Sequence, residues 1–177
     1  MQGDSNRMVS NQNLTSKGPK LPILIRQYES ADVEQVHEIN QVSLEISFRF
    51  YYDLFHKTEP ELFLVAEHEN KILGFILVKD GENFGEKPTA IIYAIAVSPN
   101  YRSSGIGTQL VNAILNVLRE KHIKKLFLHV RVGNESAIKF YLNLGFIKLQ
   151  RIREFYSWGE DADRMVKIIE QNNLNLI

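Results

Sequence analysis

Apolar residues repeat along the chain with two different periods, and these periods predict strands and helices in a mixed order. Alternation and short apolar runs between turn residues indicate strands, whereas spacings of three and four residues indicate helices. The predicted strands cover residues 21–28, 62–67, 71–79, 89–97, 125–132, 146–156 and 165–169. The predicted helices cover a segment from Ser30 to about Val42, residues 47–55, residues 106 to about 121, and residues 135–144. This order is typical of an α/β or α+β protein with a mixed sheet.

The strand predicted at residues 89–97 has two distinguishable sides. Strict alternation places every second residue of a strand on the same side. One predicted side carries Ile91, Tyr93, Ile95 and Val97, and the other carries Ala90, Ile92, Ala94 and Ala96. Because alanine is small, we expect a helix or a ligand to approach the second side closely.

The turn after this strand carries the most informative pattern in the chain. Ser98-Pro99-Asn100 ends the strand, and Arg102, Gly105 and Gly107 follow before a helix begins. The first-turn N–H groups of a helix have no intrahelical partners, and the helix dipole adds partial positive charge there. Glycine lets the backbone come close to an oxyanion. Strand, glycine turn and helix start together predict a phosphate site.

Two other phosphate motifs do not fit the residues of this turn. A P-loop requires Gly-Lys-Ser/Thr after its spacer, but Gly107 is followed by Thr108. A dinucleotide fingerprint requires a third glycine where Leu110 stands. On the turn alone, a glycine-containing connection that binds no ligand remains the other interpretation.

A second patterned block runs from Leu128 to Phe146 and predicts a strand, a capped helix and a glycine stop. Asn134 suits the N-cap, Glu135 suits the first turn, and Gly145 stands where a C′ glycine ends a helix. Apolar residues recur at helical spacing between these positions. The two blocks are separated by about one helix and one strand.

Composition narrows the classes of protein that remain. The 177 residues suffice for one domain, and 44% hydrophobic with 24% charged residues is ordinary for a globular protein. The formal net charge of +0 gives no reason to expect a nucleic-acid or membrane partner. With no cysteine, acyl transfer cannot pass through a cysteinyl intermediate, and thiolate metal sites are excluded. We expect no metal site. Residues 1–20 are polar and aperiodic, which predicts a mobile tail; without a visible signal peptide we expect a cytoplasmic protein.

The two blocks carry a resemblance to a known family. Arg102-x-x-Gly105-x-Gly107 resembles the acyl-coenzyme A pyrophosphate loop of the GNAT superfamily of N-acetyltransferases, and the block around Asn134 resembles the second acetyl-coenzyme A motif of that superfamily. The resemblance covers roughly residues 21–170 and implies one N-acetyltransferase domain at residues 21–177. The implied fold is a mixed, mostly antiparallel sheet flanked by helices, with a splayed central parallel pair of strands at 89–97 and 125–132.

The resemblance also implies acetyl-coenzyme A (acetyl-CoA) as cosubstrate and CoA as product. The pantetheine arm would pair with the free backbone edge of Ile95, Ala96 and Val97, because exposed ladder groups need partners. Asn134 and Tyr141 would lie beside the pantetheine and the thioester, with a purely capping role as the alternative for Asn134. The turn would hold the pyrophosphate through Arg102, Ser103, Ser104, Gly105, Ile106, Gly107 and Thr108.

Direct acyl transfer from a thioester to an amine requires alignment of both substrates but no covalent enzyme intermediate. Tyr141 is the candidate general acid toward the departing thiolate, with plain packing as its alternative. His129 titrates in a useful range and resembles a histidine that helps to deprotonate the amine in one N-terminal acetyltransferase subfamily; its alternative is a structural histidine. Glu45 stands where another subfamily has a catalytic glutamate, and its alternative is an exposed carboxylate.

The acceptor is implied by further segments of the chain. Residues 43–52, 60–74 and 156–165 resemble protein N-terminal acetyltransferases, particularly archaeal enzymes and eukaryotic catalytic subunits, with the ribosomal-protein alanine acetyltransferases as close relatives. A protein or peptide N-terminus would be the acceptor, with a ribosome or an auxiliary subunit as a further partner. Acetylation of lysine or of a small-molecule amine, and non-enzymatic acetyl-CoA binding, are the alternatives. The implied substrate-binding residues are Leu44, Glu45, Ile46, Tyr51, Tyr93 and Tyr156.

Overall fold

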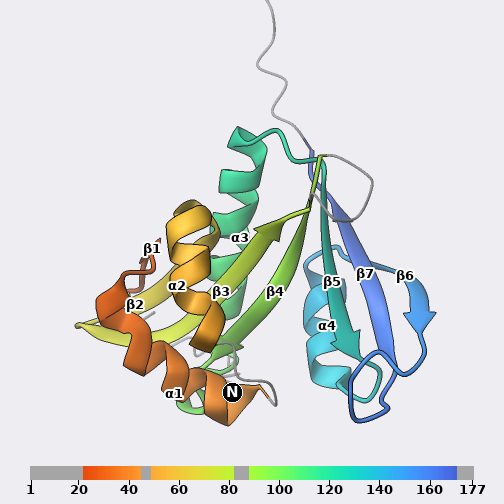
Figure 1. Cartoon of the computed structure of the whole chain (residues 1–177), viewed down its shortest axis with the longest axis horizontal. Helices are drawn as coiled ribbons and strands as arrows, with labels where there is room; N and C mark the ends of the chain where they lie inside the picture. The colour runs from red at the N-terminus through yellow and green to blue at the C-terminus, as the bar shows by residue number, and fades with distance from the viewer. Residues whose placement is uncertain (1–21, 45–48, 82–87, 171–177) are drawn as a thin grey trace, which may run out of the picture.

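The computed structural model describes residues 22–44, 49–81 and 88–170. Within these ranges a 7-stranded sheet has the order β1-β2-β3-β4-β5-β7-β6 (Figure 1). The strands are β1 (Leu24–Gln27), β2 (Phe63–His68), β3 (Lys71–Asp80), β4 (Thr89–Val97), β5 (Lys125–Arg131), β6 (Ile147–Ile152) and β7 (Ala162–Ile168). The α-helices are α1 (Val33–Ser43), α2 (Arg49–Thr58), α3 (Ile106–Glu120) and α4 (Glu135–Asn143). The tail predicted at residues 1–20 lies outside the described residues.

The centre of the sheet is opened between two parallel strands. All neighbouring strands are antiparallel except β4 and β5. β4 and β5 pair only from Thr89↔Lys125 to Ile91↔Phe127, although β5 pairs with β7 along its whole length. Beyond Ile91 the two strands diverge, as the ribbon shows (Figure 1). The predicted mixed sheet with a splayed central parallel pair is therefore confirmed.

Helices cover both sides of the sheet. In Figure 1, α1 and α2 lie in front of the sheet and α3 lies behind it. The α3 side holds a core in which residues at helical spacing are fully or nearly fully buried: Ile106, Leu110, Val111, Ile114, Leu115 and Leu118. The opposite side holds a second core rich in aromatic rings: Tyr28, Tyr52, Phe55, Phe63 and Phe75. Burial of apolar surface on both sides holds the central strands in place where they diverge.

A β-bulge at Tyr93 contradicts the predicted alternation of side chains in β4. Leu77 of β3 pairs with Ala94, but its neighbour Val78 pairs with Ile92, so Tyr93 is an extra residue in the ladder. One extra residue exchanges the two sides of a strand beyond it. The amino-acid pattern carries no signal for this insertion.

The consequence of the bulge is a different distribution of side chains from the one predicted. Four residues pack into the core on the α3 side: Ala90, Ile92, Ile95 and Val97. Only Ala94 and Ala96 pack into the core beneath α1 and α2. The Tyr93 ring lies 6.0 Å from Tyr51 and 5.5 Å from Phe55, both on α2. The small-residue side is therefore the side on which α1 approaches the sheet.

Several boundaries follow local signals, and others differ from prediction; β7, for example, begins at Ala162 rather than at Met165. The β2–β3 hairpin turns at Glu69 and Asn70, and Gly145 ends α4 with a φ of 81°, as its position predicted. The first α-helix is not capped by Ser30: α1 begins at Val33, and Ser30 belongs to the short 3-10 helix Ser30–Asp32 that precedes it. The Asp32 carboxylate accepts the Glu29 N–H at 2.9 Å in the capping box of this 3-10 helix. β6 ends at Ile152, earlier than predicted, because a turn begins at the next residue.

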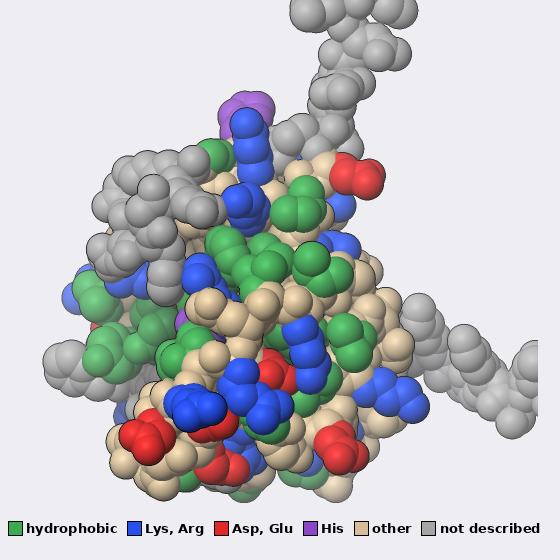
Figure 2. Space-filling view, turned by 90° about the vertical axis from the view of Figure 1, so that its right-hand side faces the viewer, with side chains coloured by type: hydrophobic (Ala, Val, Ile, Leu, Met, Phe, Trp, Pro, Cys, Tyr) green, Lys and Arg blue, Asp and Glu red, His purple; other side chains and the backbone are tan. Residues whose placement is uncertain are grey.

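The edge of the sheet at β6 exposes apolar residues. Ile147, Leu149 and Ile168 are 57%, 50% and 58% exposed. Figure 2 shows this side of the molecule, where hydrophobic side chains gather near the centre among lysine and arginine side chains. Charged side chains at an edge strand disfavour pairing with another chain. None of the helices in the described part of the chain combines the length and the apolarity needed to cross a bilayer.

Candidate active site

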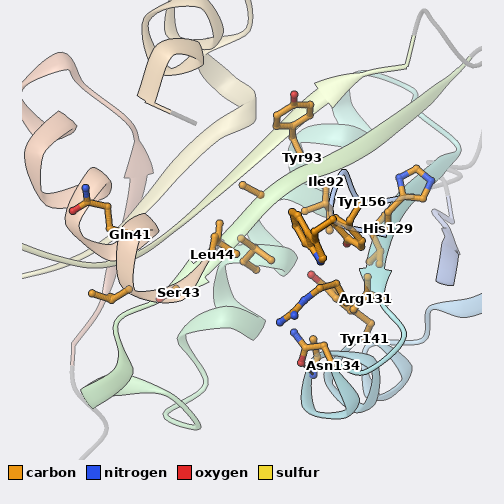
Figure 3. Close-up of a pocket in the computed structure, with 17 residues that line it drawn as sticks. Gln41, Ser43, Leu44, Ile92, Tyr93, His129, Arg131, Asn134, Tyr141 and Tyr156 are labelled. Carbon is orange, nitrogen blue, oxygen red and sulfur yellow. Dashed lines mark hydrogen bonds between the residues drawn. The ribbon is translucent and has the colours of Figure 1, made fainter. Parts of the chain in front are cut away.

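A cavity of about 550 Å³ occupies the opening between β4 and β5. Its walls come from the end of α1, the diverging parts of β4 and β5, the start of α4 and the loop between β6 and β7 (Figure 3). The cavity brings together seven of the predicted site residues: Leu44, Tyr93, Ile95, His129, Asn134, Tyr141 and Tyr156. Because these residues come from five separate elements, only the fold places them around one space.

The glycine turn stands at the end of β4, next to α4. Ser103 and Gly105 have positive φ values of 61° and 86°, which bend the chain sharply before α3 begins. Gly105 is the N-cap of α3 and has no side chain that could accept from the first turn; a Cβ added there would meet nothing within 4 Å. At Gly107 an added Cβ would lie 3.2 Å from the Phe140 ring of α4. The turn therefore leaves open space beside the first-turn N–H groups, which suits an anion.

Arg102 has a different set of partners from the phosphate contact predicted for it. Its guanidinium donates to the Val97 carbonyl at 3.3 Å and to the Ser43 hydroxyl at 3.1 Å. Val97 ends β4, and Ser43 ends α1. In this structure Arg102 thus connects the glycine turn to the segment that precedes the predicted acceptor residues.

The second motif places two side chains against the cavity. The Asn134 side-chain oxygen accepts the Ala137 N–H at 3.1 Å, so the predicted capping role is confirmed, and the residue also lines the cavity. Tyr141 is 7% exposed and packs against Phe146 at 5.5 Å between ring centroids. Burial, with a smaller contribution from Tyr156, raises the pKa of the Tyr141 phenol well above its ordinary value. The phenol is therefore protonated at neutral pH and can donate.

His129 lies on β5 at the wall of the same cavity. Its ring is tilted by 32° against the Phe155 ring at 4.4 Å. Burial, followed by the positive charge of Arg164 on β7, lowers the pKa of His129 below its ordinary value of 6.5. Both causes act against the charged form. The imidazole is therefore neutral at pH 7 and has a ring nitrogen that can accept a proton.

The remaining predicted residues are only partly brought to the cavity. Leu44, Tyr93 and Tyr156 line it, but Tyr51 lies on the far side of Tyr93, in a smaller apolar cavity of about 260 Å³ between α2 and β4. Glu45 and Ile46 lie outside the described residues. Tyr51 contacts Tyr93, which lines both cavities, and the role of Tyr51 beside the acceptor stays a prediction.

Arg131 and Trp158 are among the cavity-lining side chains that sequence reasoning did not assign to the site. Arg131 donates to the Glu160 carboxylate at 3.3 Å, and the Trp158 indole N–H donates to the same carboxylate oxygen at 2.6 Å. Arg131 directly precedes the second motif, and Trp158 is the chain's sole tryptophan. A single tryptophan in a polar loop is a usable sequence signal for a binding site, because tryptophan is enriched at binding surfaces.

The fold and the cavity together define a class of protein. A sheet opened between two parallel strands, with an anion site at a helix N-terminus and a neutral histidine with a buried tyrosine on its walls, is suited to group transfer from a phosphate-bearing donor. Three comparisons with known proteins agree with this class.

The acetyltransferase (GNAT) family matches residues 26–146 of the chain. An N-alpha-acetyltransferase of Sulfurisphaera tokodaii is 34% identical over 147 residues, which cover 78% of this chain and 88% of that protein. Ard1 from Thermoplasma volcanium superposes with a TM-score of 0.78 at 29% identity, covering 84% of this chain and 99% of that structure. The ribosomal-protein-S18-alanine N-acetyltransferase of Escherichia coli superposes with a TM-score of 0.70 at 25% identity, covering 88% and 99%. The chain belongs to the acetyltransferase (GNAT) family, and it is an N-acetyltransferase.

Proposed function

We propose that this protein transfers the acetyl group of acetyl-CoA directly to the α-amine of a protein or peptide N-terminus. The observation that carries the proposal is the cavity between β4 and β5, whose walls combine a neutral histidine and a buried tyrosine beside an anion site. Relatives named as N-alpha-acetyltransferases support the α-amine as the acceptor. An α-amine has a pKa of about 7.7–8.0, so a fraction of it is already neutral at pH 7.

The residues present fit acetyl-CoA at the glycine turn and along the free edge of β4. The first-turn N–H groups of α3 and the bend at Ser103 and Gly105 would hold the diphosphate, because oriented amides and the helix dipole favour anions. The edge of β4 beyond Ile92, which β5 does not cover, would offer backbone groups to the pantetheine amides. When bound, acetyl-CoA supplies an acyl group activated as a thioester. The protein supplies alignment, which converts a bimolecular reaction into a unimolecular one.

Each remaining step is assigned to a group of this chain. His129 accepts the proton that the attacking amine loses, through a water molecule. A backbone N–H on the free edge of β4 stabilises the oxyanion that develops on the carbonyl. Tyr141 donates its phenolic proton to the departing thiolate as negative charge develops on the sulfur. Burial keeps the phenol protonated at neutral pH until that point, because it raises the pKa.

Replacing Tyr141 with phenylalanine is expected to lower kcat by about 100-fold, because the proton donor is lost while the ring still packs against Phe146. The measurement is steady-state kinetics with a free-amine peptide, together with the melting temperature. Tyr28 provides a matched control, since its buried hydroxyl lies in the core beneath α1 and α2, remote from the cavity walls. Replacing Tyr28 with phenylalanine should leave kcat unchanged. An unchanged kcat for the Tyr141 variant would reduce this residue to a packing role.

A pair of peptides tests the acceptor. One peptide has a free α-amine and no lysine, and the other has the same length, a blocked N-terminus and one internal lysine. We expect acetylation of the first peptide and a kcat/KM at least about 10-fold lower for the second. A lysine amine has a pKa of about 10.4, so most of the lysine side chains stay protonated at pH 7 and cannot attack the thioester. Mass spectrometry identifies the modified nitrogen. Preference for the blocked peptide would establish a lysine acetyltransferase, and binding of acetyl-CoA without turnover of any amine would establish a binding module.

A further inference from the structure

The loop between β6 and β7 is held to β5 by one carboxylate. Oε2 of Glu160 accepts the Trp158 indole N–H at 2.6 Å and the Arg131 guanidinium N–H at 3.3 Å. Trp158 lies in the loop, and Arg131 is the last residue of β5. Because one carboxylate oxygen accepts hydrogen bonds from both the indole and the guanidinium, the position of the loop relative to β5 is restricted.

The loop presents two stacked rings at the cavity. The Tyr156 and Trp158 rings lie 4.8 Å apart with an interplanar angle of 20°, and both line the cavity. We call these two rings the aromatic ledge. Two backbone hydrogen bonds form the turn that carries these rings. The Tyr156 N–H donates to the Glu160 carbonyl at 3.1 Å, and the Gly159 N–H donates to the Tyr156 carbonyl at 2.8 Å. Trp158 nevertheless remains 43% exposed, so much of its ring is available to a ligand.

The aromatic ledge continues to the candidate base. Phe155 packs edge-on against Tyr156 at 5.1 Å and also contacts the His129 ring at 4.4 Å. The aromatic ledge therefore lies next to the wall on which His129 lies.

The hydrogen bonds of Glu160 to Trp158 and Arg131 are expected to contribute little to the free energy of folding. Glu160 is exposed to solvent, which screens its charge, and exposed ion pairs contribute little to folding stability. Holding a rotamer-rich side chain in its bound position, in contrast, removes part of the ordering cost of binding a ligand. Aromatic side chains also supply large contact area with few rotatable bonds.

We propose that Glu160 is a positioning residue for the acceptor: it holds Trp158 and Tyr156 as a preformed aromatic ledge that binds the polypeptide chain following the acetylated N-terminus. This inference rests on the proposed function, because it requires a polypeptide acceptor. It goes beyond that function by assigning to Glu160 the ordering of Trp158 and Tyr156. The glycine turn that would hold the diphosphate lies on other elements than the aromatic ledge, so we expect a change at Glu160 to affect peptide binding more than acetyl-CoA binding.

Trp158 provides a direct readout, because the chain contains one tryptophan. In the Glu160→Ala variant the indole loses its acceptor, so its emission should move to longer wavelength and its quenching by acrylamide should increase. Glu160→Gln keeps an acceptor oxygen for the indole but loses the charge that attracts Arg131, so it should fall between the other two proteins. Glu154→Gln removes one negative charge from the same loop at an exposed side chain and should change nothing.

Binding and turnover are then measured separately. A free-amine peptide titrated against the protein with CoA present should change Trp158 emission, and Glu160→Ala should weaken its Kd by about 10-fold. In steady-state assays the KM for the peptide should rise by a similar factor, while the KM for acetyl-CoA and the melting temperature stay constant. Equal peptide Kd values in Glu160→Ala and the unaltered protein, or a matching loss of acetyl-CoA affinity, would overturn the proposal.

The failure of this inference and the failure of the proposed function have different signatures. If the unaltered protein binds the peptide but acetylates no α-amine, the function is wrong, while the equilibrium titration still decides the role of Glu160. If the unaltered protein acetylates peptides and Trp158 emission does not respond to them, the aromatic ledge is not the acceptor surface and the assignment of Glu160 fails.

Discussion

Replacing Gly105 with valine is expected to raise the KM for acetyl-CoA by about 100-fold, the largest effect among the cofactor-side variants. Gly105 has a φ of 86°, and a β-branched residue in this left-handed region costs roughly 1–2 kcal/mol or more. The strain is relieved by moving the turn, which displaces the first-turn N–H groups of α3. Each charge-assisted hydrogen bond lost from the diphosphate costs about 1.5–3 kcal/mol. Titration with CoA and steady-state kinetics measure the change.

Gly145 supplies the matched control for this variant. It has a similar φ of 81°, ends α4 outside the cavity, and an added Cβ would meet only the flexible end of the Lys167 side chain at 3.0 Å. Gly145→Val should therefore lower the melting temperature about as much as Gly105→Val does but leave the KM for acetyl-CoA unchanged. Normal acetyl-CoA affinity in Gly105→Val would show that the glycine turn does not hold the cosubstrate.

Replacing His129 with glutamine is expected to lower kcat/KM by about 100-fold at pH 7, because general-base catalysis contributes roughly 10²–10⁴-fold. Glutamine keeps a polar side chain of similar length on β5 but cannot accept and release a proton. The KM for acetyl-CoA should change little, since the glycine turn is untouched. The expected signature is therefore a loss in turnover rather than in cosubstrate binding.

The pH profile provides the second readout for His129. Burial and the positive charge of Arg164 lower the pKa of His129 from its ordinary value of 6.5, so the base becomes protonated only below that pH. Activity that depends on neutral His129 should fall as the pH drops through this lowered value, and the fall should be absent from His129→Gln. His68, at the end of β2, does not line the cavity, and His68→Gln should retain the profile of the unaltered protein.

Glu45 is the other candidate base and lies outside the described residues, so its role stays a prediction. Adding Glu45→Gln to His129→Gln should produce a further loss only if both groups accept protons. A double variant as active as the unaltered protein would remove both residues from the list of candidate bases.

Much of the fold could be predicted because its signals are local. The order of strands and helices along the chain followed from hydrophobic periods, and Gly145 ended α4 because few residues other than glycine adopt its φ of 81°. The bulge at Tyr93 could not be predicted, because an extra residue in a strand has no compositional mark. It reversed the predicted faces of β4 and directed Tyr93 toward α2 rather than to the predicted side.

The sequence predicted the motifs of the candidate site, but it did not predict which side chains from distant segments meet there. Asn134 and the glycine turn depend on contacts with residues a few positions away in the sequence. Their structural roles could therefore be predicted from the local sequence. Tyr51 lines the adjoining smaller cavity, because the packing of α2 against β4 decides where its ring lies, and its predicted role beside the acceptor stays a prediction.

The amino-acid sequence alone determined the order of elements, the glycine turn before α3 and the capped helix α4, since each depends on contacts within a few residues. Only the tertiary structure decided which side chains share the cavity. Arg131, Trp158 and Glu160 meet because β5 and the β6–β7 loop are brought together by the pairing of β5 with β7. Such contacts depend on strand register and packing between distant segments, and no periodicity within one segment encodes them.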